Sequence, residues 1–247
     1  MLKTFAGGRL FGAGYGTGVP WVLALPGWER THRDFDDVLA GFDAIALDLP
    51  GFGAAPAPPE AWTTRQYADH VAAVLAEMAA RVVVVGHSFG GRVATHLAAA
   101  HPDRVAAQIL TGVPALTAPP DNTPRKRQPF ALRAAKALRR AGIVSEARIE
   151  QLRRQHGSAD YRRASGVMRD VLVKAVNEDY GAALAAYRGP VDLIWGRDDD
   201  QAPLAVAAAA AARFPETTAL QILDGVGHFV PHDRPDALIA AIERRRP

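Results

Sequence analysis

The chain has 247 residues, and its hydrophobic content of 49% suffices for a sizeable core, which excludes an intrinsically disordered protein. The lack of cysteine excludes disulfide bonds, thiolate metal sites and a cysteine nucleophile. A net charge of +3 is too small to indicate a nucleic-acid partner. No run suits a signal peptide or approaches the roughly 18 apolar residues of a membrane span, so we expect a cytoplasmic protein with no membrane partner.

Short apolar runs bounded by glycine and proline predict that strands and helices alternate in the first part of the chain. The expected strands are Leu10–Tyr15, Val19–Leu25 and Asp43–Asp48. The expected helices are Thr31–Ala40 and a segment that begins at Thr63 or Thr64 and extends to Met78. This alternation is typical of a parallel sheet covered by helices.

The most informative stretch is Arg81–Arg92, in which four valines lead into Gly86-His87-Ser88-Phe89-Gly90. The valines predict a strand buried on both faces, and the alanine-rich residues after Gly91 predict a helix. A G-x-S-x-G sequence between a strand and a helix places its serine on a strained turn at the carboxyl edge of the sheet. Ser88 is therefore the predicted nucleophile.

After the next expected strand, Val105–Thr111, only helices are expected up to about Tyr187. These helices are Phe130–Ala141, Ser145–His156 and roughly Ala159–Asn177. Alternation resumes with the strand Val191–Trp195, the helix Pro203–Phe214, the strand Thr218–Leu223 and the helix Pro235–Arg245.

We therefore predict an α/β fold with a mostly parallel central sheet, helices on both faces and an inserted all-helical lid. The predicted core comprises residues 1–113 and 188–247, and the predicted lid comprises residues 114–187. An insertion that follows the carboxyl end of a strand stands over the edge where open α/β sheets bind ligands.

A serine nucleophile needs a base, and histidine is suited to this role because its pKa lies near neutral pH. Among eight histidines, His228 follows the last strand in a glycine-containing loop at the carboxyl edge. It is favoured over His232, which lies nearer the start of the final helix. His87 directly precedes Ser88, so its side chain is expected to diverge from the serine and to have a packing or shaping role.

The base needs a carboxylate that fixes its tautomer. Asp198, Asp199 and Asp200 follow the strand that ends at Trp195, again at the carboxyl edge. Side chains in a turn fan out, so these three cannot all face inward. Their positions alone do not select one of them.

The order of these features resembles the α/β-hydrolase superfamily, and in particular its lidded serine hydrolases, such as carboxylesterases and carrier-protein methyl-ester hydrolases. The resemblance covers nearly the whole chain and is carried by four motifs, at Gly86–Gly91, Asp48–Gly53, Trp195–Asp199 and Gly227–Pro231. It implies that Asp199 completes a triad with Ser88 and His228. It implies neither a metal nor a cofactor.

The same resemblance implies that the backbone N–H groups of Trp28 and Phe89 form an oxyanion hole. One departure bears on this expectation, because Pro26-Gly27 stands where the family usually has His-Gly. Backbone donors survive that change, but the internal hydrogen bonding of the loop must differ.

The expected lid is strongly basic. Between residues 114 and 175, fourteen lysines and arginines face five aspartates and glutamates, an excess of nine, so the rest of the chain carries a net −6. Such asymmetry can steer an anionic small-molecule ester or an acidic carrier protein to the site, or it can simply be the solvated surface of arginine-rich helices.

The leading hypothesis is a serine hydrolase that cleaves a small carboxylic ester through an acyl-enzyme on Ser88. Hydrolysis of carbon–carbon bonds in ring-cleavage products by the same triad is the alternative reaction. A non-catalytic ligand-binding member of the fold is the alternative of a different class. Haloalkane dehalogenases and epoxide hydrolases are disfavoured because they need a carboxylate where Ser88 stands.

Overall fold

The computed structural model describes residues 2–114, 116, 145, 159–214 and 219–247. Their strands form one eight-stranded sheet in the order β1-β2-β4-β3-β5-β6-β7-β8. β1 and β2 pair antiparallel, as do β2 and β4, and every later pairing is parallel. The strands are β1 (Leu2–Phe5), β2 (Leu10–Tyr15), β3 (Val22–Leu25), β4 (Ala44–Asp48), β5 (Val82–His87), β6 (Val105–Thr111), β7 (Val191–Gly196) and β8 (Ala219–Leu223).

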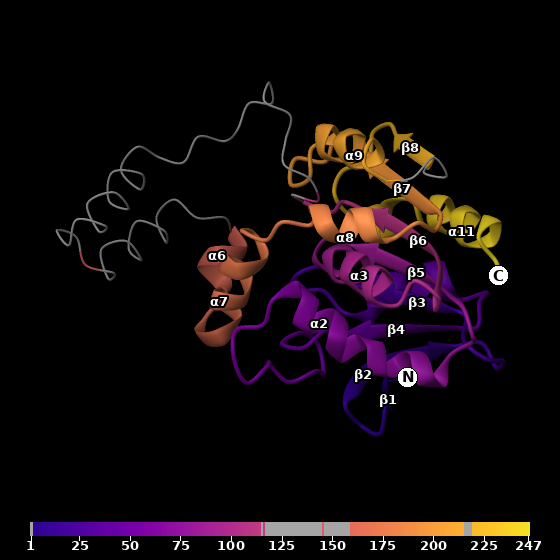
Figure 1. Cartoon of the computed structure of the whole chain (residues 1–247), viewed down its shortest axis with the longest axis horizontal. Helices are drawn as coiled ribbons and strands as arrows, with labels where there is room; N and C mark the ends of the chain where they lie inside the picture. Colours follow the sequence, from indigo (N-terminus) through magenta and orange to yellow (C-terminus); the bar gives the residue numbers. More distant parts are fainter. Residues whose placement is uncertain (1, 115, 117–144, 146–158, 215–218) are drawn as a thin grey trace.

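Helices cover both faces of this sheet, and α2, α3 and α8 lie over one face in Figure 1. The described α-helices are α1 (Asp36–Leu39), α2 (Thr64–Val71), α3 (Phe89–Ala100), α6 (Ala159–Arg163), α7 (Gly166–Ala175), α8 (Gly181–Ala186), α9 (Leu204–Ala211), α10 (Val230–Asp233) and α11 (Pro235–Arg244). Two 3-10 helices are added, η1 (His32–Phe35) and η2 (Ala72–Glu77). The predicted fold class is confirmed.

The core has two layers because β5 alternates its valines between the two faces of the sheet. Val82 and Val84 pack in the layer that contains α2, α3, α8 and α9. Val83 and Val85 pack in the layer that contains α1 and α11. A strand buried on both faces explains the unbroken valine run, and it holds the turn at Ser88 in the interior of the sheet.

Most of the expected helices and strands are present. The differences lie where contacts between distant parts of the chain determine the local structure. β1 was not predicted, and it is an exposed edge strand that relies on pairing with β2. The helix expected over Ala159–Asn177 is divided into α6 and α7, and the one expected up to Met78 ends as η2. The expected helices Phe130–Ala141 and Ser145–His156 lie outside the described residues, apart from Ser145. The division of the chain at residues 113/114 and 187/188 stays a prediction.

The C-terminal part of the expected lid is attached to the core through Glu178. Its carboxylate accepts hydrogen bonds from the Thr64 backbone N–H (2.9 Å to Oε1) and from the Tyr180 hydroxyl (3.0 Å). A carboxylate at the first turn of α2 is also favoured by the helix dipole. Within the described residues, no helix is long and apolar enough to cross a membrane.

Close packing at the start of α3 yields a test of stability. An added Cβ at Gly90 would lie 2.1 Å from the backbone oxygen of Leu25, so Gly90→Ala should lower the free energy of unfolding by about 2 kcal/mol or more. Gly41→Ala is the matched control, because nothing lies within 4 Å of an added Cβ there. Its effect should stay below about 1 kcal/mol. Urea unfolding of both variants measures the difference, and equal effects would contradict the packing argument.

Candidate active site

Ser88 occupies the turn between β5 and α3 with a strained backbone. Its φ of 51° and ψ of −115° lie outside the regions that residues with a side chain normally adopt. The Ser88 N–H donates to the carbonyl of Thr111 (2.9 Å), and its own carbonyl accepts from the Gly91 N–H (3.0 Å). These bonds fix the turn at both ends. Such strain persists only where the surroundings enforce it, and it is frequent at catalytic residues.

His228 and Asp199 form a buried pair on the loops that follow β8 and β7. The Nδ1 atom of His228 lies 3.0 Å and 2.9 Å from the two carboxylate oxygens of Asp199. One of those oxygens also accepts the backbone N–H groups of Gln201 (2.9 Å) and Ala202 (2.7 Å). Because an ionised carboxylate only accepts, Nδ1 carries the proton and Nε2 is left as the acceptor in the neutral ring.

Burial distinguishes Asp199 from the two aspartates beside it, and His228 from His232. Asp199 is 5% exposed and His228 is 6% exposed, whereas Asp198, Asp200 and His232 are all exposed. The structure therefore brings Asp199 to His228 and leaves the neighbouring carboxylates in solvent.

Ser88 and His228 line the same pocket, which has a volume of about 540 Å³. The lining comes from the loop after β3, the turn at Ser88, the loops that follow β7 and β8, and α6. Its residues are Gly27, Trp28, Glu29, Arg30, His87, Ser88, Ala159, Asp160, Arg163, Gln201, His228 and Phe229. A pocket of this size accommodates a small-molecule substrate. Its charged lining residues are balanced, with two arginines and two carboxylates.

Of the two residues expected to supply the oxyanion hole, Trp28 lines this pocket, and Phe89 directly follows Ser88, which also lines it. Phe89 follows Ser88 at the first position of α3, where N–H groups lack a partner within the helix. The Trp28 indole packs edge-to-face on the rings of Phe52 (4.8 Å between centroids) and Phe89 (5.3 Å), so aromatic packing links the two residues. Neither amide donates a hydrogen bond to another described residue.

His87 joins β5 to the loop that carries His228. Its Nε2–H donates to the backbone carbonyl of His228 (3.0 Å), which ties the strand before the serine to the loop of the histidine. Its buried Nδ1 has no described partner, and an added Cβ at Gly27 would lie 3.0 Å from it. Burial, reinforced by the charge of His228, lowers the pKa of His87 to about 3. No local pattern signals this contact, because the two histidines are 141 positions apart.

A second aspartate, Asp48, organises the turn after β4. One of its oxygens accepts the His32 backbone N–H and lies 2.8 Å from His32 Nδ1, and the other accepts the Ala54 N–H (2.9 Å). An added Cβ at Gly53, which has a positive φ of 56°, would collide with this carboxylate. The Asp48–Gly53 motif is thus explained by turn structure.

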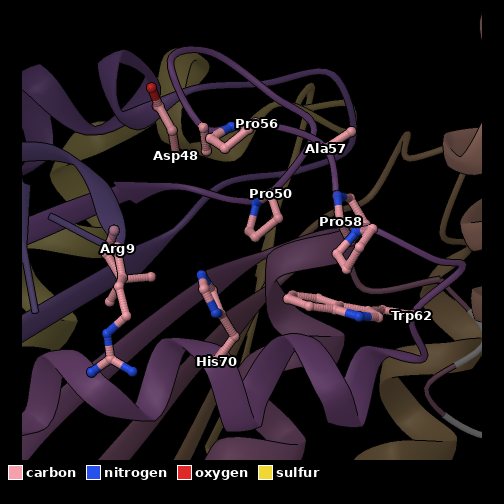
Figure 2. Close-up of a pocket in the computed structure, with 11 residues that line it drawn as sticks. Arg9, Asp48, Pro50, Pro56, Ala57, Pro58, Trp62 and His70 are labelled. Atoms are coloured by element: carbon pink, nitrogen blue, oxygen red, sulfur yellow. The ribbon is translucent and has the colours of Figure 1, made fainter.

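A separate pocket of about 150 Å³ lies between this proline-containing loop and α2. Figure 2 shows Pro50, Pro56 and Pro58 across from Trp62 and His70. Ser88, Asp199 and His228 are not part of its lining. Within the described ranges, no three histidine, aspartate or glutamate side chains are grouped so that they could hold a metal ion.

Four apolar residues of the expected lid, Phe130, Leu132, Leu138 and Ile143, lie outside the described residues. Met168 is described and does not line the Ser88 pocket. It packs against Gly51 and Tyr67 instead.

Comparison with known proteins identifies the family of the chain. The model of a family described as "Alpha/beta hydrolase family" matches residues 22–241. A pimeloyl-[acyl-carrier protein] methyl ester esterase of Aromatoleum aromaticum is 31% identical over 250 residues, covering 89% of this chain and 96% of that protein. A 2-hydroxy-6-oxononadienedioate/2-hydroxy-6-oxononatrienedioate hydrolase of Cupriavidus pinatubonensis is 28% identical over 233 residues, covering 82% and 76%. The expected family resemblance is confirmed.

Among solved structures, a thermophilic esterase from Thermogutta terrifontis (malate bound) superposes with a TM-score of 0.66 at 22% identity. The match covers 99% of this chain and 97% of the esterase. At this identity the likeness supports the shared fold alone.

The neutral, buried state of His87 predicts a pH-dependent stability. The folded protein keeps His87 neutral down to about pH 3, whereas the unfolded chain protonates it near 6.5. Between these values the unfolded state binds more protons, so stability is full above pH 6.5 and is lost as the pH falls. Between about pH 7.5 and pH 5.0 the wild type should therefore lose about 2 kcal/mol more than His87→Gln. Urea unfolding at both pH values measures this, and equal losses would disprove it.

Proposed function

Because the chain belongs to the α/β-hydrolase family, we propose that it hydrolyses small-molecule carboxylic esters through an acyl-enzyme on Ser88. The observation that carries the proposal is the buried contact between His228 and Asp199, made beside a strained serine that lines the same pocket. A base oriented by a carboxylate next to a nucleophile is the arrangement that acyl transfer needs.

In the first half of the reaction, Nε2 of His228 takes the proton of the Ser88 hydroxyl as its oxygen attacks the ester carbonyl. Asp199 holds the ring in the tautomer that leaves Nε2 free and stabilises the imidazolium that forms. The tetrahedral oxyanion accepts hydrogen bonds from the amides of Trp28 and Phe89. Collapse expels the alcohol, which leaves with the proton from His228.

In the second half, water replaces the alcohol. His228 takes a proton from the water, which attacks the acyl-serine, and the same two amides stabilise the second oxyanion. Collapse releases the carboxylic acid and returns the proton to Ser88. These steps are complete with the residues of this chain.

A related reaction shares the machinery and remains the second candidate. The relative from Cupriavidus pinatubonensis is named as a hydrolase of 2-hydroxy-6-oxononadienedioate, and a triad of this kind can also serve carbon–carbon bond hydrolysis. Parallel assays with p-nitrophenyl butyrate and a vinylogous diketone separate the two reactions. Turnover of the diketone alone would exclude the ester proposal.

The charge of the substrate is a separate matter. The methyl ester esterase relative is named for an acyl-carrier-protein substrate, and the expected lid is basic, which favours an anionic ester or an acidic carrier protein. The described lining of the pocket is balanced in charge, so this preference would have to come from basic residues of 114–175 outside that lining.

The nucleophile is tested directly with a fluorophosphonate probe. The wild type should be labelled covalently and should hydrolyse p-nitrophenyl butyrate, and Ser88→Ala should lose both properties, with turnover falling by at least about 10⁴. A folded wild type that is neither labelled nor active would favour a ligand-binding protein instead.

The choice of acid is tested with three amide substitutions. Asp199→Asn should lower kcat by about 10³–10⁴, because an amide N–H facing Nδ1 favours the wrong tautomer of His228. Asp198→Asn and Asp200→Asn are matched controls, since both side chains are exposed, and their kcat should stay within about twofold of the wild type. A larger loss in either control than in Asp199→Asn would reassign the acid.

A further inference from the structure

The loop after β3 is joined to α6 by an ion pair at the mouth of the Ser88 pocket. Arg163 Nε donates to the Glu29 carboxylate (2.7 Å), and Arg163 Nη2 donates to Asp160 (2.6 Å), one turn earlier on α6. All three residues line the pocket. Glu29 and Arg163 are 134 positions apart in the chain, so the contact connects the sheet to the segment inserted after β6.

Glu29 has an unusual backbone for a residue with a side chain. Its φ is 56°, and among the described residues other than glycine only Ala6, Glu29 and Ser88 have a positive φ. Two of these three line the same pocket. Glu29 is the third residue of a turn that the Arg30 N–H closes by donating to the Gly27 carbonyl (3.2 Å), and type II turns need a positive φ at this position. The ion pair to Arg163 braces this turn from outside the backbone.

The neighbouring residue, Trp28, makes a second connection to the same helix. Its indole packs both against the main core and against a small cluster of Tyr161, Ala164 and Leu172, which belongs to α6, α7 and the turn between them. Two consecutive residues therefore fasten the loop to α6, one by its ring and the other by its charge. The amide between Gly27 and Trp28 lies just before the strained position.

We infer that Glu29 and Arg163 are positioning residues, whose ion pair holds the Trp28 amide where it stabilises the oxyanion. The inference rests on the proposed function of Ser88 and adds a coupling between α6 and the transition state. With the pair intact, the turn from Gly27 to Arg30 stays closed and holds the Trp28 N–H toward the pocket. Without the pair, this turn can open, which lets the Gly27–Trp28 peptide rotate and misdirects the donor.

The exposure of the pair determines how the coupling responds to salt. Arg163 is 58% exposed and Glu29 is 35% exposed, so their attraction is weakened by dissolved ions. A neutral ester makes no charged contact of its own with the pocket. Its turnover should nevertheless fall at high salt, because the positioning of the amide depends on the pair.

The experiment compares Glu29→Gln, Arg163→Gln, the double variant and Arg163→Lys in the full-length protein. A neutral ester gives kcat and KM, and phenylboronic acid, which forms a tetrahedral adduct with a serine nucleophile, gives an inhibition constant. Arg234→Gln is the matched control, because Arg234 forms an exposed pair with Asp236 on α11, outside the pocket.

Each glutamine variant should lower kcat about tenfold and weaken the boronate by a similar factor, a part of the roughly 10²–10³ that loss of an entire oxyanion donor costs. KM should change by less than about twofold, since the donor acts mainly on the transition state. The double variant should be no worse than either single variant, because both remove one interaction. Arg163→Lys keeps the charge but not the fork of donors that reaches both Glu29 and Asp160, so its kcat should lie between those of the wild type and Arg163→Gln.

Salt provides the readout that a purely structural role would not change. In about 1 M NaCl, where the Debye length is about 3 Å, the wild-type kcat should approach that of the glutamine variants, and their own kcat should not change. Unchanged kcat in both single variants, or additive losses in the double variant, would overturn the inference while the labelling of Ser88 still supports the hydrolase. A wild type that Ser88→Ala shows to be inactive would instead remove the proposed function itself.

Discussion

The site depends on how closely the start of α3 approaches the strands beneath it. An added Cβ at Gly86 would lie 2.6 Å from the Cα of Gly91, and one at Gly90 would lie 2.1 Å from a carbonyl of β3. Only a chain without side chains at these positions can turn from strand to helix so sharply. The turn forces Ser88 into its strained conformation and brings the loop of Gly27 and Trp28 against the serine. The proposed nucleophile and the proposed oxyanion donors therefore share one packing constraint.

The polar support of the site follows from the parallel sheet. β3, β5, β6, β7 and β8 end at one edge, so the loops after them meet there although they are distant in the chain. Asp199 is fixed by two backbone N–H groups, and His228 is held on one side by that carboxylate and on the other by His87. A fully buried imidazole that stays neutral can hold the His228 loop without placing a charge beside the proposed base.

The sequence predicted the parts of this arrangement that have a local signature. The valine run, the glycines around Ser88 and the order of elements sufficed for the fold class, because each depends on periodicity or turn chemistry. The three adjacent aspartates could not be separated by position alone, since their difference is one of burial. The contacts of His87 with His228 and of Glu29 with Arg163 join distant segments. No local pattern pairs such residues, and the left-handed backbone of Glu29 has no compositional marker.

The role inferred for Arg163 also bears on how the protein would recognise an anionic substrate. Its guanidinium already donates to Glu29 and Asp160, so a substrate carboxylate at this position would have to displace one of them. If it displaced Glu29, it would release the contact that holds the loop of Trp28 at the moment when the oxyanion forms. Arg30 is likewise engaged, with two hydrogen bonds to Asp34. The two arginines of the described pocket therefore stabilise its internal structure. Selection for a negatively charged substrate, if the enzyme has it, must come from other basic residues between 114 and 175.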